Sequence, residues 1–210
     1  MATRGFSTLD PAQGSWAVSH ARSVVDAVVE TGSLPPAPST VDPVFEADRG
    51  AFVTLEKATG LRGCIGRPEP EQAAIRAIRE AAKGAATEDP RFPPVGPSEL
   101  EAITVEVSVL TAPRPIEASD AQAIMEAVTV GEHGLILRGG NRSGLLLPQV
   151  PVEQGWGVET FLDHACQKAG LSPGAWRDQE VSVERFSAQV FAEVEPYGPV
   201  EEESRPGSEQ

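Results

Sequence analysis

The hexapeptide LRGCIG, residues 61–66, places a cysteine two positions after an arginine and between two glycines. In a β-strand, alternate side chains point to opposite faces, so Arg62 and Cys64 would share one face, roughly 7 Å apart. The other face carries Leu61 and Ile65, which we expect to pack on the core. A cation near a thiol favours the thiolate, which is the nucleophilic form of cysteine. One hypothesis is therefore that Cys64 is a reactive thiol.

The alternative hypothesis is that Cys64 is a packing residue. A free cysteine is often a small buried hydrophobe, and flanking glycines can mark a bulge or a close contact between backbones. No histidine or second cysteine stands at motif distance from Cys64. Cys166, the other cysteine, lies among apolar residues at helical spacing, which predicts a core position. The sequence leaves the role of Cys64 open.

The spacings that metal sites require are missing from the sequence. CxxC, HxH and HExxH do not occur, and His20, His133 and His164 are scattered. The glycine-rich segment RGGNRSG, residues 138–144, joins two predicted strands and precedes no helix, unlike a phosphate-binding loop. We therefore expect no metal site, and the sequence identifies no cofactor.

The elements that must position these residues alternate between helices and pairs of strands. Apolar residues at helical spacing predict helices in three main segments, 16–32, 71–87 and 158–170, with a short helix and turn in 119–134. Alternation and turn residues predict a hairpin over 50–67, a strand around 103–109, a second hairpin over 134–150 and an extended segment over 182–194.

This order of elements predicts an α+β fold with mostly antiparallel strands, because helices and hairpins interleave without βαβ regularity. We expect a flexible N-terminus over residues 1–16 and one domain over 17–195. Residues 196–210 are rich in Pro, Gly, Ser and Glu, which predicts a disordered acidic tail.

The charge balance excludes some classes of partner. Acidic residues number 31 and basic residues 17, for a net charge of −14. Such a field repels phosphate backbones and anionic membrane surfaces, so we expect no membrane binding and no non-specific nucleic-acid binding. The sequence shows neither a span of about 20 apolar residues nor an N-terminal signal, and we expect a cytoplasmic protein.

Several segments together, in this order, resemble the AMMECR domain family, whose prokaryotic members are called AmmeMemoRadiSam system protein A. The resemblance runs from about residue 18 to 195, and its most specific mark is the intact LRGCIG. It also rests on the segments GAFVTLEKATG, DPRFPPV, ITVEVSVL, GEHGLIL, GLLLPQV and FLDHACQKAGL. It implies an α+β fold with a larger and a smaller subdomain. It also implies a Memo-like protein and a radical SAM protein as partners, but no established activity.

The resemblance carries a set of positions over to this chain without assigning roles: Arg62, Cys64, Asp89, Arg91, Phe92, Glu106, Ser108, His133, Pro148 and Gln149. We take Cys64, Arg62, Glu106 and His133 as candidate catalytic residues. Candidate binding residues are Arg91, Phe92, Ser108 and Gln149.

Several of these positions also have a purely structural interpretation. Glu106 and Ser108 can form the wet face of a half-buried strand, and Glu106 would neutralise Arg62 if the two strands pair closely. Asp89 can close the turn at Pro90, and His133 can hold the turn in GEHG as readily as act in acid–base chemistry.

Three functions remain open on the sequence alone. The first is an enzyme or enzyme subunit of a modification system, in which Cys64 forms a covalent adduct or thioester with a small molecule or macromolecule. The second is a non-catalytic partner that binds or presents a ligand, with Arg62 and Arg91 holding an anionic group. The third is a scaffold in which the motif residues maintain the fold.

Overall fold

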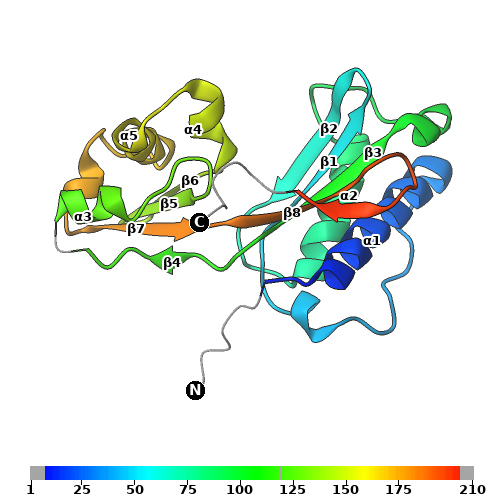
Figure 1. Cartoon of the computed structure of the whole chain (residues 1–210), viewed down its shortest axis with the longest axis horizontal. Coiled ribbons are helices and arrows are strands. Elements are labelled where there is room, and N and C mark those ends of the chain that lie inside the picture. The colour runs from blue at the N-terminus through cyan, green and yellow to red at the C-terminus, as the bar shows by residue number, and fades with distance from the viewer. Residues whose placement is uncertain (1–7, 119, 204–210) are drawn as a thin grey trace. The chain divides into compact units, whose positions relative to one another are not determined.

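The computed structural model of the chain describes residues 8–118 and 120–203 (Figure 1). The chain folds into two compact units. Unit 1 contains residues 8–111 and 189–203, and unit 2 contains residues 112–188. Unit 2 is thus inserted into unit 1, and the predicted domain span of 17–195 covers unit 2 and most of unit 1.

The elements of unit 1 form an antiparallel sheet with two long helices. The sheet has the strand order β2-β1-β3-β8-β9. In chain order, the elements are α1 (Pro11–Thr31), the 3₁₀ helix η1 (Pro43–Phe45), β1 (Ala51–Lys57), β2 (Gly60–Arg67), α2 (Ala74–Thr87), η2 (Pro97–Ala102), β3 (Thr104–Leu110), β8 (Ala188–Glu193) and β9 (Val200–Glu202).

Alternation along the strands decides which face of this sheet is covered. Val53 and Leu55 of β1 are fully buried and pair with Val107 and Val105 of β3, which are also fully buried. These side chains join one apolar core with those of α1 and α2. The intervening residues of β1 and β3 point to the opposite face, where Thr54 is only half-buried. The predicted strand around residues 103–109 is confirmed, including its buried apolar face.

The predicted first helix is confirmed at its C-terminal end but begins earlier than expected. Gly32 ends α1 in the left-handed conformation, with φ of +70°, which glycine adopts without steric cost. At the other end, Asp10 and Gln13 form a reciprocal capping box, and Pro11 occupies the first helical position.

The prediction of a flexible N-terminus is therefore wrong for residues 8–16. Leu9 is buried, and its N–H and carbonyl both bond the side-chain amide of Gln189 on β8. We expected the ordered part of the chain to begin with the apolar pattern. The capping box of α1 and the bonds to the Gln189 amide instead order the chain before that pattern. Residues 1–7 lie outside the described part of the chain.

The prediction of a disordered tail from residue 196 is wrong for residues 196–203. β9 pairs antiparallel with β8, and the turn between them is closed by the bond from the Val194 N–H to the Pro199 carbonyl. Backbone groups at the edge of a sheet accept a further strand with little regard to its side-chain composition, so low apolar content did not reveal it. Residues 204–210 lie outside the described residues.

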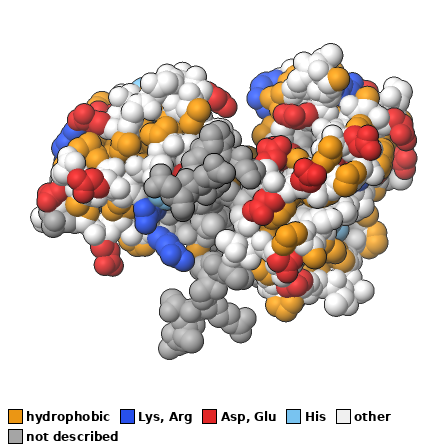
Figure 2. All heavy atoms as spheres, in the orientation of Figure 1, with side chains coloured by type: hydrophobic (Ala, Val, Ile, Leu, Met, Phe, Trp, Pro, Cys, Tyr) orange, Lys and Arg blue, Asp and Glu red, His pale blue; other side chains and the backbone are white. Residues whose placement is uncertain are grey.

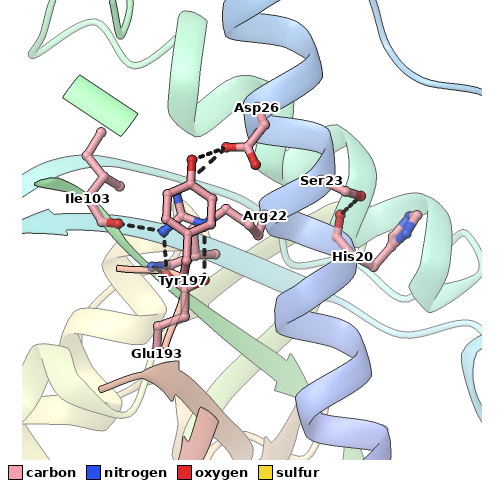
Figure 3. A network of polar contacts seen from close by, with 8 residues as sticks. His20, Arg22, Ser23, Asp26, Ile103, Glu193 and Tyr197 are labelled. Atoms are coloured by element: carbon pink, nitrogen blue, oxygen red, sulfur yellow. Dashed lines mark hydrogen bonds and ion pairs between the residues drawn. The ribbon is translucent and has the colours of Figure 1, made fainter. Parts of the chain in front are cut away.

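A buried ion pair fixes the strand that returns from unit 2. The guanidinium of Arg22 on α1 bonds both carboxylate oxygens of Glu193 on β8, and their side chains are only 7% and 4% exposed. Arg22 also donates to the Ile103 carbonyl, and Glu193 accepts from the Val105 N–H at 3.0 Å (Figure 3).

Tyr197 covers this pair from the β8–β9 turn. Its ring lies over the Arg22 guanidinium, with 4.3 Å from Cζ to the ring centroid, and its hydroxyl donates to Asp26 at 3.2 Å (Figure 3). Tyr197 has φ of +58°, a left-handed conformation that costs an ordinary residue roughly 1–2 kcal/mol. The ring contact and the hydrogen bond offset that cost.

Unit 2 is built on a second antiparallel sheet, with the strand order β4-β7-β5-β6. Phe161, Leu162 and Cys166 on its helix α5 are fully buried in one core with Leu135 and Leu137. This confirms the predicted core position of Cys166. The elements of unit 2 are β4 (Arg114–Pro115), α3 (Ala121–Glu126), β5 (Gly134–Gly139), β6 (Arg142–Leu146), α4 (Gln149–Gln154), α5 (Val158–Lys168), η3 (Ala175–Arg177) and β7 (Val181–Phe186).

The fold class expected from the sequence is confirmed. The protein has an α+β fold with antiparallel sheets, helices packed on them, and a larger and a smaller unit. None of the helices within residues 8–118 and 120–203 is long and apolar enough to cross a membrane.

The buried ion pair leads to a stability prediction. Removing one charge leaves the other buried and unpaired, so Glu193→Gln should lower the free energy of unfolding by about 3 kcal/mol. The double variant Arg22→Met with Glu193→Leu should lose less than Glu193→Gln alone, because no unpaired charge remains. Urea denaturation measures both, with Glu201→Gln on exposed β9 as the control. Equal losses in the control and in Glu193→Gln would contradict the prediction.

Candidate functional site

The hexapeptide lies on β2, which is the edge strand next to β1. Cys64 pairs with Thr54 and Gly63 with Leu55, but Glu56 pairs with Leu61, so Arg62 is the additional residue of a β-bulge. The bulge breaks the alternation on which the sequence prediction depended. The expectation that Leu61 packs on the core is wrong, since 40% of its surface is exposed.

The glycines of the hexapeptide allow close packing. A Cβ at Gly63 would lie 2.2 Å from the carbonyl oxygen of Ala85 on α2, and one at Gly66 would overlap the Phe52 ring. On α2, Gly84 in turn leaves room for the Ile65 side chain, which would lie 2.8 Å from a Cβ at position 84. The strand therefore approaches the helix more closely than any residue with a side chain at position 63 would permit.

Cys64 begins a row of polar side chains that crosses three strands on the face of the sheet opposite α1 and α2. Thr54 faces Cys64 on one side and Glu106 of β3 on the other. The Thr54 Oγ1 atom is 3.5 Å from Cys64 Sγ and 3.3 Å from Glu106 Oε1, and the Ser108 hydroxyl donates to the same Oε1 at 3.3 Å.

This row can carry a proton from the thiol to the carboxylate. A threonine hydroxyl has one hydrogen and two lone pairs. The single Thr54 hydrogen can be donated either to Cys64 Sγ or to Glu106. When Thr54 donates it to Glu106, the Thr54 oxygen is able to accept the hydrogen of the Cys64 thiol. The arrangement of a nucleophile, a bridging hydroxyl and a carboxylate base is one by which a thiol can be activated.

Asp89 holds the backbone of Cys64 in place. Its carboxylate is only 3% exposed, accepts the Cys64 N–H at 2.8 Å and binds Arg91 through both oxygens. It also accepts the Arg91 N–H, which closes the turn at Pro90 that the sequence indicated. Arg91 donates in turn to the Cys64 carbonyl at 3.4 Å. The Asp89–Arg91 pair thus bonds both backbone groups of Cys64, as a neighbouring strand would.

Arg62 is paired with Glu99 rather than with the thiol. Its Nε and Nη2 atoms each lie 2.9 Å from a Glu99 oxygen, and Lys57 bonds the same carboxylate. Arg62, as the first influence, holds the pKa of Glu99 well below its usual range. We considered Glu106 as the carboxylate that pairs with Arg62, but the structure shows that Glu99 is that partner.

The part of the reactive-thiol hypothesis in which Arg62 favours the thiolate of Cys64 is wrong, since Arg62 is paired with Glu99. Burial is the largest influence and raises the pKa of the Cys64 thiol, and the carboxylates Glu106 and Asp89 act in the same direction. The hydrogen bond from Thr54 and the charge of Arg91 oppose the shift without cancelling it. The surroundings of Cys64 therefore favour the protonated form of its thiol.

The loop after α2 places an aromatic ring beside this row. The Phe92 ring lies between two guanidiniums, with 5.9 Å from Arg62 Cζ and 5.5 Å from Arg91 Cζ to its centroid. Arg62 is 11% exposed, whereas 53% of the Arg91 side chain is exposed. Of the two arginines proposed as anion ligands, Arg91 is therefore the more accessible.

His133, Pro148 and Gln149 belong to unit 2. His133 Nδ1 accepts the Thr129 N–H at 2.9 Å and so holds the turn before β5. Burial, together with the charge of Arg185, lowers the pKa of His133. Gln149 is the exposed first residue of α4.

Sequence reasoning missed Thr54 and Glu99. Thr54 stands between Val53 and Leu55 on an alternating strand. This pattern indicates that Thr54 faces away from the core, but it does not identify Thr54 as a neighbour of Cys64. Glu99 has a weak signal, since it lies three positions after Gly96 and accepts its N–H at the start of η2. In the described ranges, no group of three or more His, Cys, Asp or Glu side chains is placed to hold a metal ion.

The fold and this site define a class of protein: an α+β protein with an inserted second unit and a half-buried thiol on an edge strand of the first. The sequence matches the AMMECR1 family model over residues 18–191. The chain belongs to the AMMECR1 family, as the resemblance implied.

The sequence is similar to other proteins over most of its length. Protein MK0488 of Methanopyrus kandleri is 48% identical over 193 residues, which cover 90% of this chain and 93% of that protein. Protein MJ0810 of Methanocaldococcus jannaschii is 46% identical over 190 residues, which cover 90% and 94%. The crystal structure of uncharacterized protein PH0010 from Pyrococcus horikoshii superposes with a TM-score of 0.78 at 41% identity, covering 93% of this chain and 98% of that one.

The charges around Cys64 lead to a prediction about its titration. The Cys64 thiol should alkylate with a pKa above that of free cysteine, as burial raises it. Arg91→Gln should raise that pKa further, whereas Arg62→Gln should leave it unchanged because Glu99 neutralises Arg62. The measurement is the pH dependence of iodoacetamide labelling, followed peptide by peptide. A profile that responds to Arg62 and not to Arg91 would contradict the assignment.

The paired carboxylates lead to a prediction about acid stability. Bonding to Arg91 and to backbone N–H groups holds the pKa of Asp89 well below its usual range. A depressed folded-state pKa contributes stability that is present above the unfolded value of about 3.9 and is lost as the pH falls. The free energy of unfolding should therefore fall more steeply below about pH 4 in the native chain than in Asp89→Asn. Parallel curves for the two proteins would show that Asp89 contributes nothing.

Proposed function

We propose that this protein is the thiol-bearing component of a modification system, in which Cys64 attacks an electrophilic carbon of a small molecule or macromolecule. The observation that supports this proposal is the position of the Thr54 hydroxyl, 3.5 Å from Cys64 Sγ and 3.3 Å from Glu106 Oε1. In this proposal Cys64 is the nucleophile, Glu106 the base and Thr54 the group between them.

The proposed step balances without a further reactant. A bond forms between Cys64 Sγ and the carbon as the bond from that carbon to its leaving group breaks. The thiol proton moves to the Thr54 oxygen while the Thr54 proton moves to Glu106. The leaving group departs with its electron pair, and Glu106 then returns the proton to it through the Thr54 hydroxyl. General-base assistance of this kind is typically worth 10²–10⁴-fold in rate.

The raised thiol pKa is compatible with this role. A thiol that stays protonated at rest reacts slowly with oxidants and stray electrophiles, because the thiolate is the reactive form. Reaction then requires a substrate that is held close enough for the base to act.

The partners implied by the family resemblance fit a modification system. We propose that a Memo-like protein and a radical SAM protein supply or receive the group that Cys64 carries. The second candidate function is a non-catalytic partner that binds or presents a ligand. The exposure of the Arg91 side chain beside the Phe92 ring favours this alternative.

The role of Glu106 predicts the direction of one rate change. Glu106→Gln removes a negative charge that raises the Cys64 pKa, so electrostatics alone would make Cys64 alkylate faster. If Glu106 is the base, the same variant should alkylate more slowly, on the order of tenfold at a pH below the thiol pKa. The measurement is the rate of iodoacetamide labelling at Cys64 in the folded protein, with buried Cys166 reporting any unfolding.

Variants at Thr54 provide the matched control. Thr54→Ser keeps the hydroxyl and should keep the rate, whereas Thr54→Val keeps the size and should slow labelling as Glu106→Gln does. Faster labelling of Glu106→Gln, or equal rates for Thr54→Ser and Thr54→Val, would contradict the proton route. A Cys64 that stays unlabelled until the protein unfolds would contradict the nucleophile itself and favour the ligand-binding function.

A further inference from the structure

An open cavity of about 600 Å³ lies in unit 1 at the end of the sheet. Its walls come from the β1–β2 turn, the start of β3 and the β8–β9 turn, and they include Ala58, Ala102, Thr104, Val194 and Pro196. These walls are mainly apolar, and small-molecule sites of 300–1,000 Å³ are of this kind. Val194, with 59% of its surface exposed, contributes an apolar side chain to these walls.

The cavity and Cys64 share one face of the sheet. Glu56 pairs with Thr104, and both line the cavity. They lie two residues along their strands from Thr54 and Glu106, which form the row with Cys64. Residues two apart point to the same side and are about 7 Å apart along the strand. The cavity therefore begins one row beyond the thiol and its proposed base.

The charged residues around the cavity determine whether it favours a cationic or an anionic ligand. Lys57 shares the single Glu99 carboxylate with Arg62, whereas two carboxylates, those of Glu56 and Glu195, line the cavity beside Lys57 and outnumber its charge. On the face seen in Figure 2, acidic side chains are more frequent than basic ones over unit 1. With a net charge of −14 on the whole chain, the local field favours a cation and repels an anion.

We infer that this cavity binds the apolar, amine-bearing part of the molecule that Cys64 modifies. The inference rests on the proposed function, because it makes the cavity a binding subsite for the same substrate. The substrate is then a molecule with an electrophilic carbon at one end, an apolar chain or ring of a few atoms, and a protonated amine at the other end. Apolar contact with the cavity walls provides affinity, and Glu56 with Glu195 provides selectivity for the amine.

Thiol-reactive probes with different tails test this inference. In an alkyl methanethiosulfonate, the Cys64 sulfur attacks the alkylthio sulfur, a mixed disulfide forms, and methanesulfinate leaves with the electron pair while the thiol proton passes to a base. The tails are methyl, hexyl, aminohexyl and carboxypentyl. The aminohexyl reagent should modify Cys64 on the order of tenfold faster than the methyl reagent and with saturable kinetics. The hexyl reagent should lie between them, and the carboxypentyl reagent should be slower than hexyl.

Two sets of variants locate the effect. Val194→Trp fills the cavity and should abolish the advantage of the long tails without changing the methyl rate, whereas Val152→Trp, at a valine of similar exposure in unit 2, should change neither. Glu56→Gln with Glu195→Gln should abolish the preference for aminohexyl over carboxypentyl. Glu201→Gln, on exposed β9, is its control.

The outcomes separate this inference from the proposed function. If the methyl reagent modifies Cys64 and the tails make no difference, or if Val152→Trp acts like Val194→Trp, the cavity inference is overturned and the nucleophile stands. If Cys64 reacts with no reagent before unfolding, both are overturned. A preference for the carboxypentyl tail would overturn the assignment of the amine.

Discussion

The ion pair between Arg22 and Glu193 is the interaction on which the rest of unit 1 depends. The chain leaves this unit after β3 and returns at β8, and the pair joins two residues that are 171 positions apart. Both charges are almost fully buried, so an alternative packing of β8 would leave each of them without a partner at a cost of several kcal/mol. The pair therefore specifies one position for the returning strand, next to β3.

That position has consequences for the proposed site. With β8 in place, β3 is an interior strand, and Glu106 on β3 lies one strand from Thr54 and two strands from Cys64. The β8–β9 turn then contributes Val194, Glu195 and Pro196 to the cavity at the end of the sheet. The contact of Tyr197 with Arg22 holds this turn in a conformation that a non-glycine residue rarely adopts. A buried charge pair on the helix side of the sheet thus helps to build the cavity wall on the opposite face.

The edge position of the hexapeptide creates a second constraint. An edge strand presents N–H and carbonyl groups that another chain could pair with. At Cys64 both groups are bonded by Asp89 and Arg91, so the backbone of the proposed nucleophile is held in place and is not open to another chain. Asp89 consequently combines the turn role that its sequence context indicates with a role in positioning the thiol. Because its carboxylate accepts the Cys64 N–H, that N–H is not available to stabilise an oxyanion. In the proposed reaction, the groups that assist Cys64 are therefore side chains such as those of Thr54, Glu106 and Arg91.

The sequence by itself determined the α+β class, the hairpins, the buried face of β3 and the end of α1 at Gly32. These follow from periodicity and from the conformational freedom of glycine, which are local properties. It also identified Cys64, Glu106, Asp89 and Arg91 as residues worth attention, through a family resemblance. Only the tertiary structure decided their partners. The bulge at Arg62 shifts the strand alternation, Glu99 arrives from a separate 3₁₀ helix to neutralise Arg62, and Thr54 meets Cys64 through strand pairing. The thiol pKa depends on burial, on a hydrogen bond with Thr54 and on charges from two other segments of the chain. The order of residues 196–203 depends on a free sheet edge, so neither could be predicted from local sequence.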